Sequence, residues 1–327
     1  MRAGRVSYPT HPAISVVVPL YNEEESVESL IDQVVEVLTS IGCDWEFLLI
    51  DDGSRDRTKT RVLERCEEDP RLRLIAFRAN FGQTPALAAG FDHARGEVVI
   101  TMDGDLQNDP RDIPRLLEEV AAGADIVSGW RKDRKDKLLT RRVPSIVANW
   151  LIGRVTGVRI HDYGCTLKAY RREVIQNLPM YSDMHRFIPA LAASGGARVS
   201  ELVVRHHPRR FGTSKYGISR TFKVILDLLV VQMLLRFSSR PLHWFGLLSV
   251  PCLLLSVFSL LVGFVEATGF ADLAVLKLWT ITFPSIAVLF LILFAHLIFV
   301  GLLSELIVEV AGPMPRRLTK SIAKEVY

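Results

Sequence analysis

The sequence predicts an α/β protein, in which a mostly parallel sheet is covered by helices on both faces and a C-terminal hairpin of two membrane helices follows. The first observation is that short apolar, β-branched runs alternate with amphipathic segments up to about residue 217, the order expected of βαβ units. The second is that two long apolar runs come only after this charged, Pro- and Gly-punctuated part. The 327-residue chain therefore divides into a water-soluble body and a membrane tail.

Five short runs in the body are the strand candidates, and amphipathic segments lie between them. The strand candidates are ISVVVP at 14–19, WEFLLID at 45–51, LRLIAF at 72–77, EVVITMD at 97–103 and DIVSG at 125–129. The clearest helix candidates are EEESVESLIDQVVEVLTS at 23–40 and RDIPRLLEEVAAG at 111–123. Parallel strands place their carboxyl ends at one edge of a sheet, where ligands bind. Polar residues that follow these strands are therefore expected to meet.

Two apolar runs in the tail are long enough to cross a bilayer. Trp244–Val265 contains 22 residues without Asp, Glu, Lys or Arg, and Trp279–Leu303 contains 25 residues whose only ionisable side chain is His296. At about 1.5 Å per residue each run spans a hydrocarbon core of about 30 Å. Buried helices of a globular protein are the alternative explanation.

Basic residues flank both ends of this hairpin, whereas the link between the runs, EATGFADLAVLK, is poor in them. The flanking residues are Arg236 and Arg240 before the first run, and Arg316, Arg317, Lys320 and Lys324 after the second. The positive-inside rule then places both ends of the hairpin in the cytoplasm. The N-terminus has no continuous apolar core of a secretion signal, so the body is expected at the cytoplasmic face of the inner (plasma) membrane, as part of a multi-pass protein.

The net charge of +4 is mild, but basic residues are clustered. Positions 131–142 hold seven basic residues against two aspartates, which is typical of a solvated loop or of a surface for anions. A second basic stretch, 205–223, runs into an amphipathic segment at 218–237 that is expected to lie on the bilayer surface. The four cysteines, Cys43, Cys66, Cys165 and Cys252, have no metal-ligand spacing and are expected to be reduced thiols.

Three polar clusters follow strand candidates: PLYNEEE after the first, DDGSRD after the second and DGDLQND after the fourth. Neither a G-x-G-x-x-G nor a G-x-x-x-x-G-K-[ST] motif is present, which disfavours a dinucleotide site and a P-loop. The ring of Tyr21 could stack on a base, or could simply pack at a strand end. Glu23 and Asp52 could accept hydrogen bonds from a base or a ribose.

The pair Asp103 and Asp105 is the more informative of these clusters. Two carboxylates at the end of one strand repel each other unless a cation lies between them. Mg²⁺ or Mn²⁺, held by one or two carboxylates and by substrate phosphates, is the usual solution, and Gln107 could add an amide oxygen. A D-x-D pair on a surface loop is the alternative. Asn108, Asp109 and Pro110 are expected to cap and begin the next helix.

Several motifs together resemble glycosyltransferase family 2, and within it the polyprenyl-phosphate glycosyltransferases, such as dolichol-phosphate mannose synthase and the bacterial undecaprenyl-phosphate sugar transferases. The resemblance rests on VVVPLYNEEE, LLIDDGSRDRT, NFGQTPALAAGFDHARGEVVITMDGDLQNDP, IVSGWR, DYGCTLKAYRREV and RRFGTSKYG, in this order and with two C-terminal spans. It covers the chain from about Ile14 to Val310. DYGCTLKAY, RFIPALA and FGTSKY are closest to the undecaprenyl-phosphate aminoarabinose transferase branch.

The resemblance implies a GT-A (Rossmann-like) catalytic domain, a nucleotide-sugar donor such as a UDP-sugar, a divalent Mg²⁺ or Mn²⁺ ion and a polyprenyl phosphate acceptor. It implies binding and catalytic roles for matching positions. These are Pro19, Tyr21, Glu23, Ile50 and Asp52 for the nucleotide; Asp103, Gly104 and Asp105 for the metal and diphosphate, with Gln107 as a further ligand; Arg131, Arg209 and Lys215 for the phosphates; and Asp162 for the catalytic base.

An acceptor phosphate with a second pKa of about 6 is already largely dianionic at pH 7. Asp162 then has little proton to remove, so we expect it to orient the acceptor or to take the last proton. A turn former beside Gly164 is the alternative for Asp162. Attraction to lipid headgroups is the alternative for Arg209 and Lys215, which precede the amphipathic segment.

The sequence thus predicts a membrane-anchored inverting glycosyltransferase that binds no nucleic acid, and the resemblance adds an expectation of self-association. The predicted parts are a tail at 1–13, the catalytic domain at 14–217, an interfacial helix at 218–240, two transmembrane helices within 241–310 (about 244–265 and 279–303), and a cytoplasmic tail at 311–327. A processive polysaccharide synthase is one alternative, disfavoured because QMLLRF from Gln232 departs from Q-x-x-R-W. A non-catalytic membrane adaptor that binds nucleotide is the other.

Overall fold

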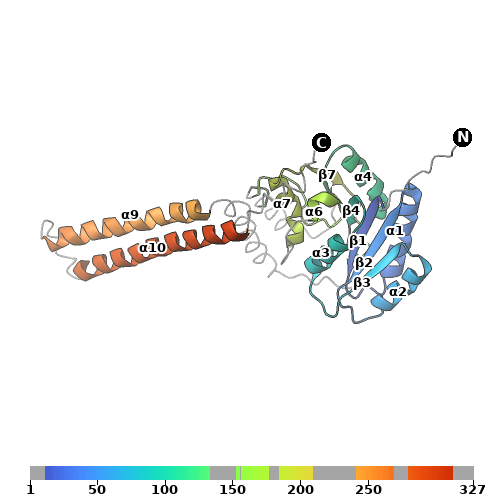
Figure 1. Cartoon of the computed structure of the whole chain (residues 1–327), viewed down its shortest axis with the longest axis horizontal. Coiled ribbons are helices and arrows are strands. Elements are labelled where there is room, and N and C mark those ends of the chain that lie inside the picture. Colours follow the sequence, from blue (N-terminus) through green and yellow to red (C-terminus); the bar gives the residue numbers. More distant parts are fainter. Residues whose placement is uncertain are drawn as a thin grey trace. The chain divides into compact units, whose positions relative to one another are not determined.

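A computed structural model of the chain describes residues 12–132, 152–154, 156–176, 184–208, 241–268 and 279–311. The chain divides into two compact units, one of Met1–Gln232 with Arg317–Tyr327 and one of Met233–Arg316 (Figure 1). The first unit holds the α/β domain and the second holds a pair of long helices. The predicted interfacial helix at 218–240 and both predicted tail segments, apart from residues 12–13 of the first and Ala311 of the last, lie outside the described residues.

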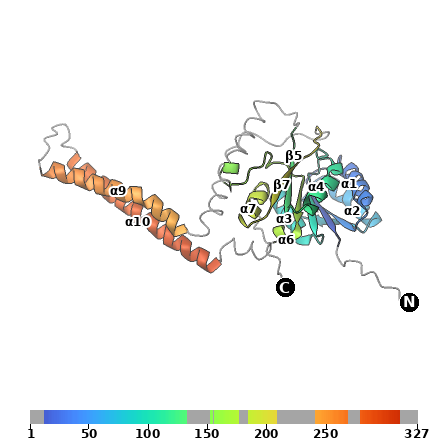
Figure 2. The same cartoon turned by 90° about the horizontal axis from the view of Figure 1, so that it is seen from above.

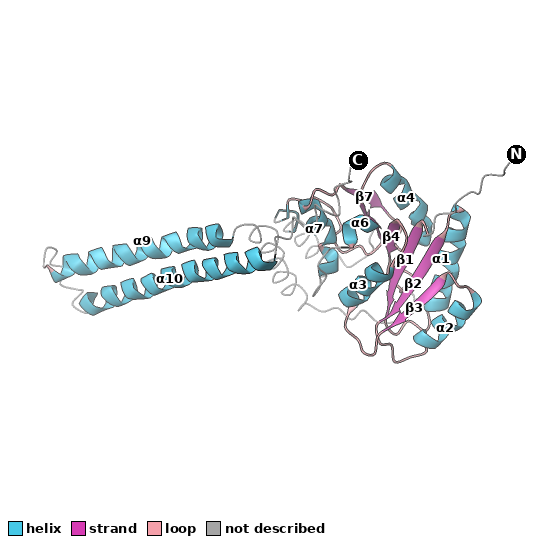
Figure 3. Ribbon diagram, viewed as in Figure 1, coloured by secondary structure: helices cyan, strands magenta, loops and turns pink. Residues whose placement is uncertain are grey.

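A seven-stranded sheet forms the centre of the α/β domain, in the order β3-β2-β1-β4-β6-β5-β7. Figure 3 shows β3, β2, β1 and β4 side by side in this sheet. The strands are β1 Ile14–Leu20, β2 Trp45–Asp51, β3 Leu72–Ala76, β4 Val98–Thr101, β5 Ile126–Trp130, β6 Lys168–Arg171 and β7 Val199–Val203. β1 pairs in parallel with both β2 and β4, β2 pairs in parallel with β3, and β5 pairs in parallel with β7. All five predicted strands are confirmed, and so is the mostly parallel sheet.

The sequence pattern did not predict β6 and β7. β6 has the sequence KAYR, which is only four residues long and half basic, so it gives no apolar run. It lies antiparallel between β4 and β5, with Lys168 opposite Thr101 on one side and opposite Ser128 on the other. The short strand is therefore stabilised by two neighbours rather than by its own composition. Its consequence for the site is that the segment before it is brought to the carboxyl ends of β4 and β5.

Helices cover both faces of the sheet (Figure 2). They are α1 Val27–Ile41, α2 Thr58–Glu68, α3 Gln83–His93, α4 Ile113–Ala121, α6 Arg172–Ile175 and α7 Ile188–Ser194, with 3-10 turns η1 Pro110–Asp112 and η3 Met184–Arg186. Alternation along β1 decides which face each helix meets. Val16 and Val18 join one core cluster with the apolar stripes of α1, α2 and α4. Val17 points the other way, where Gly90 lets α3 approach so closely that a Cβ would lie 2.2 Å from a Val17 methyl group.

The second unit consists of α9 Pro241–Ala267 and α10 Trp279–Ala311. Both helices are long and apolar enough to cross a membrane over Pro241–Val265 and Ile281–Ile307. Only 22% and 11% of the most apolar windows of these helices are buried, so they do not match the alternative of helices inside a globular core. Large apolar side chains such as Leu247, Phe258 and Ile292 are exposed along them, as expected where lipid replaces water.

Small residues form the contact between α9 and α10. Ser249 and Ser256 are almost fully buried on α9, and Ser256 Oγ donates a 2.8 Å hydrogen bond to the carbonyl oxygen of Ala287 on α10. At the other end of the pair, the Glu305 carboxylate on α10 accepts a 3.0 Å bond from the backbone N–H of Leu242 in the first turn of α9. That N–H has no partner within its own helix, so α10 caps α9. Close packing and interhelical hydrogen bonds are the interactions that hold helices together in lipid.

The turn after β2, which carries one of the polar clusters, requires glycine at position 53. A substitution there tests the backbone geometry of this turn. Gly53 has φ +70°, and a Cβ on it would lie 2.5 Å from the backbone carbon of Ala79. Gly42 has φ +76°, but a Cβ there would meet nothing within 4 Å. Both Gly→Ala variants carry left-handed strain of about 1–2 kcal/mol. Only Gly53→Ala adds an overlap, of about 1–3 kcal/mol.

We therefore expect Gly53→Ala to lower the Tm of the α/β domain by about 2–12 °C more than Gly42→Ala does. Thermal unfolding of the detergent-solubilised protein, followed by near-UV circular dichroism, measures both shifts. Equal shifts for the two variants would mean that the backbone of Ala79 is not close to Gly53.

Candidate active site

The turns that follow β1 and β2 are bonded to each other, as the positions of their polar clusters suggested. The backbone N–H of Asn22 donates to Ser54 Oγ at 3.0 Å, and Asn22 Oδ1 accepts a 2.9 Å bond from the N–H of Arg55. The N–H of Glu23 donates to Thr58 Oγ1 at 2.8 Å. Asn22 has φ +55°, a conformation that Asn tolerates better than most residues. The two clusters thus form one polar surface at the carboxyl edge of the sheet.

The predicted nucleotide residues occupy different positions at this edge. Pro19 and Tyr21 are half-buried at the end of β1, where a ligand can reach them. The carboxylate of Glu23 accepts a 2.7 Å bond from Ser26 Oγ at the start of α1. Ile50 is 0% exposed, so its side chain belongs to the core and cannot itself touch a nucleotide.

Asp52 is bonded to the loop after β3. Its carboxylate accepts hydrogen bonds from the backbone N–H of Phe81 at 2.7 Å, the N–H of Gly82 at 2.8 Å and Asn80 Nδ2 at 2.8 Å. Burial raises the pKa of Asp52 and the neighbouring charge of Asp51 adds to this, while the two backbone donors oppose it. Asp52 therefore fixes the loop that leads into α3, and a nucleotide would have to share its oxygens with that loop.

Asp103 and Asp105 follow β4 and are held in a compact turn. Asp103 Oδ1 accepts a 2.9 Å bond from Gln83 Nε2, and Oδ2 accepts a 2.6 Å bond from Thr166 Oγ1. A Cβ on Gly104 would lie 2.6 Å from Cδ2 of Leu20, which is itself buried in the core. Glycine between the two aspartates thus lets this turn lie directly against the end of β1. Leu106, which follows Asp105, has φ +59°. This left-handed backbone conformation is unfavourable for a residue with a bulky side chain.

The donor set fits a hard divalent cation. Burial raises the pKa of Asp103, and the charge of Asp105 raises it further, so the pair carries unfavourable negative charge when both groups are ionised. Among the described residues no group of three or more His, Cys, Asp or Glu side chains is placed to hold a metal. The pair would therefore complete a coordination shell with water, an amide oxygen and ligand phosphates, which is the usual environment of Mg²⁺.

Gln107 and its neighbours are placed by the segment that follows β7. Gln107 Nε2 donates to the carbonyl oxygen of His207 at 3.4 Å, and the N–H of Gln107 donates to Asp105 Oδ1 at 3.2 Å. The predicted helix start is confirmed for Asp109, whose carboxylate accepts from the N–H of Arg111, and for Pro110, which begins η1 before α4. The prediction was wrong for Asn108, which does not cap the helix; its Nδ2 donates to Thr166 Oγ1 at 3.1 Å.

Arg131 and Asp162 form a bidentate ion pair, although they are 31 positions apart in the sequence. Arg131 Nε lies 2.7 Å from Asp162 Oδ2, and Arg131 Nη2 lies 3.0 Å from Asp162 Oδ1. The two side chains are only 11% and 8% exposed. Burial acts to lower the pKa of Arg131, but the hydrogen bonds and charge of Asp162 outweigh it and raise that pKa above its ordinary value. The two residues that were assigned separate roles, phosphate binding and base, therefore act as one unit in this structure.

Three further residues belong to this site and were missed from the sequence: Gln83, Thr166 and Lys168. Gln83 and Thr166 hold Asp103, as described above. Lys168 is buried and donates to the carbonyl oxygens of Tyr163, at 3.2 Å, and of Cys165. Burial lowers the pKa of Lys168 to about 8. Gln83 and Thr166 lie within the motifs NFGQT and DYGCT, which were the only signal available.

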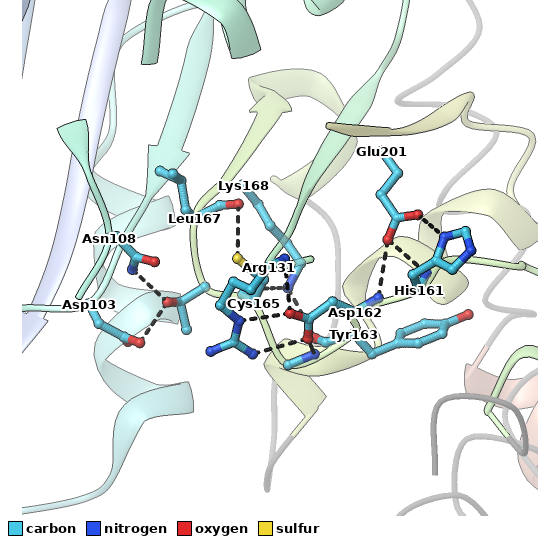
Figure 4. A network of polar contacts seen from close by, with 12 residues as sticks. Asp103, Asn108, Arg131, His161, Asp162, Tyr163, Cys165, Leu167, Lys168 and Glu201 are labelled. Atoms are coloured by element: carbon cyan, nitrogen blue, oxygen red, sulfur yellow. Dashed lines mark hydrogen bonds and ion pairs between the residues drawn. The ribbon is translucent and has the colours of Figure 1, made fainter. Parts of the chain in front are cut away.

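These contacts join into one network that runs from Asp103 through Thr166 and the 162–165 segment to Arg131 (Figure 4). The segment that precedes β6 thus contacts Asp103 through Thr166 and Arg131 through Asp162. Arg209 and Lys215, the other predicted phosphate ligands, lie outside the described residues.

Solved structures with the same arrangement of strands and helices define the class of fold. Glucosyl-3-phosphoglycerate synthase from Mycobacterium tuberculosis, in complex with Mn²⁺, UDP and phosphoglyceric acid, is similar with a TM-score of 0.52 at 20% identity, over 68% of this chain and 78% of that one. A complex of the same enzyme with Mn²⁺, UDP and glucosyl-3-phosphoglycerate gives a TM-score of 0.53 at 18% identity, over 68% and 80%. At this identity the likeness concerns the fold alone, which is the predicted GT-A fold.

Sequence comparison then gives the family. The family model described as "Glycosyl transferase family 2" matches residues 15–178. The dodecaprenyl-phosphate galacturonate synthase of Rhizobium johnstonii is 49% identical over 241 residues, 72% of this chain and 71% of that protein. The undecaprenyl-phosphate 4-deoxy-4-formamido-L-arabinose transferase of Edwardsiella ictaluri is 38% identical over 296 residues, 90% of this chain and 88% of that protein. The chain belongs to glycosyl transferase family 2, and it is an enzyme that transfers a sugar; the resemblance predicted from the motifs is confirmed.

Proposed function

We propose that this protein transfers a sugar, with inversion, from a nucleotide sugar to a polyprenyl phosphate at the cytoplasmic face of the inner membrane. Both relatives named above are described as acting on polyprenyl phosphates, one on a dodecaprenyl and one on an undecaprenyl phosphate. A UDP-linked donor is what the resemblance of the motifs implies. The two apolar helices would keep the catalytic domain beside its lipid substrate.

The observation that carries this proposal is the network that joins Asp103, one member of a carboxylate pair suited to a metal diphosphate, to the buried Arg131–Asp162 pair (Figure 4). The end of β4 supplies Asp103 and Asp105, and the segment before β6 supplies Asp162 and Thr166. A donor diphosphate and an acceptor phosphate both need cationic partners. A divalent cation held by Asp103 and Asp105 would be one, and the guanidinium of Arg131 would be the other. The polar surface at the ends of β1 and β2 remains for the nucleoside.

Mg²⁺ or Mn²⁺, held by Asp103 and Asp105 with Gln107 as a further ligand, would stabilise the negative charge that develops on the leaving diphosphate. Tyr21 would stack on the base, and Glu23 and Asp52 would hold the ribose or base edge. Arg131, with Arg209 and Lys215, would bind phosphate oxygens.

The acceptor phosphate oxygen attacks the anomeric carbon as the bond to the diphosphate breaks, so the sugar inverts and the nucleoside diphosphate leaves. Asp162 already accepts hydrogen bonds from both Arg131 nitrogens and from the N–H of Gly164 at 3.1 Å. This engagement suits a residue that orients Arg131 and the acceptor better than one that generates the nucleophile. A phosphate acceptor needs no strong base, because it is largely dianionic at pH 7.

Membrane attachment would follow the predicted organisation, with a catalytic domain at 14–217, an interfacial helix at 218–240 and two spans within 241–310. The cap between Glu305 and Leu242 ties the ends of the two helices that face the same side. The positive-inside rule places that side in the cytoplasm.

A donor panel tests the proposed function. Purified full-length protein in detergent or nanodiscs would be incubated with undecaprenyl or dodecaprenyl phosphate, Mg²⁺ or Mn²⁺, and UDP-linked sugars that include galacturonate and 4-deoxy-4-formamido-L-arabinose. We expect one donor to give a glycolipid whose mass equals lipid phosphate plus the sugar residue, and EDTA to abolish its formation. Nucleotide binding with no product from the whole panel would favour the non-catalytic adaptor, and a polymeric product would favour a processive synthase.

A further inference from the structure

The edge strand β7 holds the segment that carries Asp162 through a single carboxylate. Glu201 Oε1 accepts two backbone hydrogen bonds, from the N–H of His161 at 2.7 Å and from the N–H of Asp162 at 3.1 Å. Glu201 Oε2 lies 2.7 Å from Nδ1 of the His161 ring (Figure 4). The side chain of Glu201 is only 14% exposed, so these three contacts replace most of its contact with water. Hydrogen bonds to an ionised carboxylate are among the stronger ones in proteins.

The residues that Glu201 holds face the end of β5 in two successive pairs. The ring of His161 stacks on the ring of Trp130, with centroids 4.1 Å apart and planes 13° from parallel. The residue after His161 and the residue after Trp130 then form the ion pair of Asp162 with Arg131. Glu201 lies opposite Ser128 in the parallel pairing of β7 with β5, so the carboxylate and both pairs are anchored to the same strand.

This arrangement means that contacts to two different parts of Asp162 help to fix its position. Its carboxylate is held by Arg131, and its backbone is held by Glu201. If the backbone restraint is lost, the ion pair can follow the segment as it moves, and the guanidinium moves with it. A displacement of about 1 Å in a group that orients a substrate lowers turnover by about 100-fold.

We propose that Glu201 is a positioning residue, which fixes the His161–Asp162 backbone so that the Arg131–Asp162 pair is presented to the acceptor phosphate. The kinetic part of this inference rests on the proposed function. Glu201 acts through the backbone of Asp162 and touches no reacting atom. Its effect should therefore fall on turnover and on the use of the lipid acceptor, and it should leave binding of the nucleotide and metal, at the ends of β1, β2 and β4, unchanged.

Three variants test the kinetic part. Glu201→Ala removes all three contacts, and we expect kcat to fall about 30- to 100-fold while the KM for the nucleotide sugar changes less than threefold. Glu201→Gln keeps an oxygen that can accept from both backbone donors, and we expect it to retain at least a fifth of the wild-type kcat. Glu118→Ala removes an exposed glutamate of α4 and is the matched control, with wild-type kinetics expected. Full activity of Glu201→Ala, or equal losses for Glu201→Ala and Glu201→Gln, would overturn the proposal.

Hydrogen exchange tests the same restraint without any substrate. In the wild-type protein the amides of His161 and Asp162 should be protected, and in Glu201→Ala they should exchange at least 10-fold faster while amides of β1 and β2 stay protected. Exchange of these two wild-type amides at the rate of an unstructured peptide would overturn the proposal, even if Glu201→Ala does not fold. Because this readout needs no donor, a failed donor panel with protected amides would reject the proposed function and leave the positioning role supported.

Discussion

Replacing Asp105 with Asn should lower sugar transfer by roughly a thousandfold, about 4 kcal/mol of transition-state stabilisation, with little change in fold. Asn has the same shape but carries no charge, so the pair would keep its packing and lose much of its attraction for a divalent cation. Asp103→Asn should behave similarly, since the amide oxygen can accept from Gln83 Nε2 while the amide NH2 can donate to the hydroxyl of Thr166. Initial rates measured across a titration of Mn²⁺ and Mg²⁺ would show the loss, and excess metal should restore at most a small part of it.

Asp92→Asn is the matched control, because Asp92 is an exposed aspartate of α3 and its charge should not matter. A second control is thermal unfolding, in which Asp105→Asn should be no less stable than wild type in the absence of metal, as it removes repulsion between two carboxylates. If Asp105→Asn kept more than a fifth of wild-type activity at equal metal concentration, the carboxylate pair would not be the metal site.

Breaking the Arg131–Asp162 pair should have the largest effect on stability together with a large loss of activity. Arg131→Met leaves the Asp162 carboxylate buried without its guanidinium, and breaking a buried ion pair on one side costs about 3–5 kcal/mol. We expect Asp162→Asn to lower turnover at saturating lipid by about 100-fold, and the double variant Arg131→Met/Asp162→Asn to be no worse than the poorer single variant. Such non-additivity is what a pair acting as one unit produces.

An ion pair on the protein surface is the control for this set of single and double variants. Arg61 and Glu28 lie 2.9 Å apart between α2 and α1, but their side chains are 35% and 50% exposed. Arg61→Met should change the free energy of unfolding by about 1 kcal/mol or less, since exposed ion pairs contribute little. Unfolding in urea and steady-state kinetics would be measured for all variants. Unchanged turnover of Asp162→Asn at saturating lipid would show that Asp162 neither orients the acceptor nor takes a proton.

Much of the fold could be predicted because it depends on local patterns. Four of the predicted strands, β1, β2, β4 and β5, have apolar runs that are almost entirely buried, and the edge strand β3 is half-buried. Such runs can be recognised in the sequence without any knowledge of their neighbours. The two apolar helices could be predicted for the same reason, because each is a continuous apolar run in the sequence. β6 was missed because its basic, four-residue sequence becomes a strand only between β4 and β5.

The sequence predicted which residues of the candidate site gather at the edge of the sheet. It predicted less well which atoms those residues contact there. Asp52 is expected to accept from a nucleotide, but nothing in the sequence indicated that its oxygens also hold the loop at Asn80–Gly82. Ile50 matched a family position, yet its side chain is in the core. A motif gives the type of residue at a position. The atoms that this residue contacts depend on segments elsewhere in the chain.

The sequence by itself determined the α/β class, the membrane tail, the family and the carboxylate pair at the end of β4, since hydrophobic periodicity and motif order are properties of contiguous residues. Only the tertiary structure decided the partners. Asp103 meets Thr166 across 63 positions, and Asp162 meets Glu201 across 39. Those pairings follow from the antiparallel insertion of β6 beside β4 and β5, because the order of strands in a sheet, and not their order in the chain, decides which side chains are within hydrogen-bonding distance.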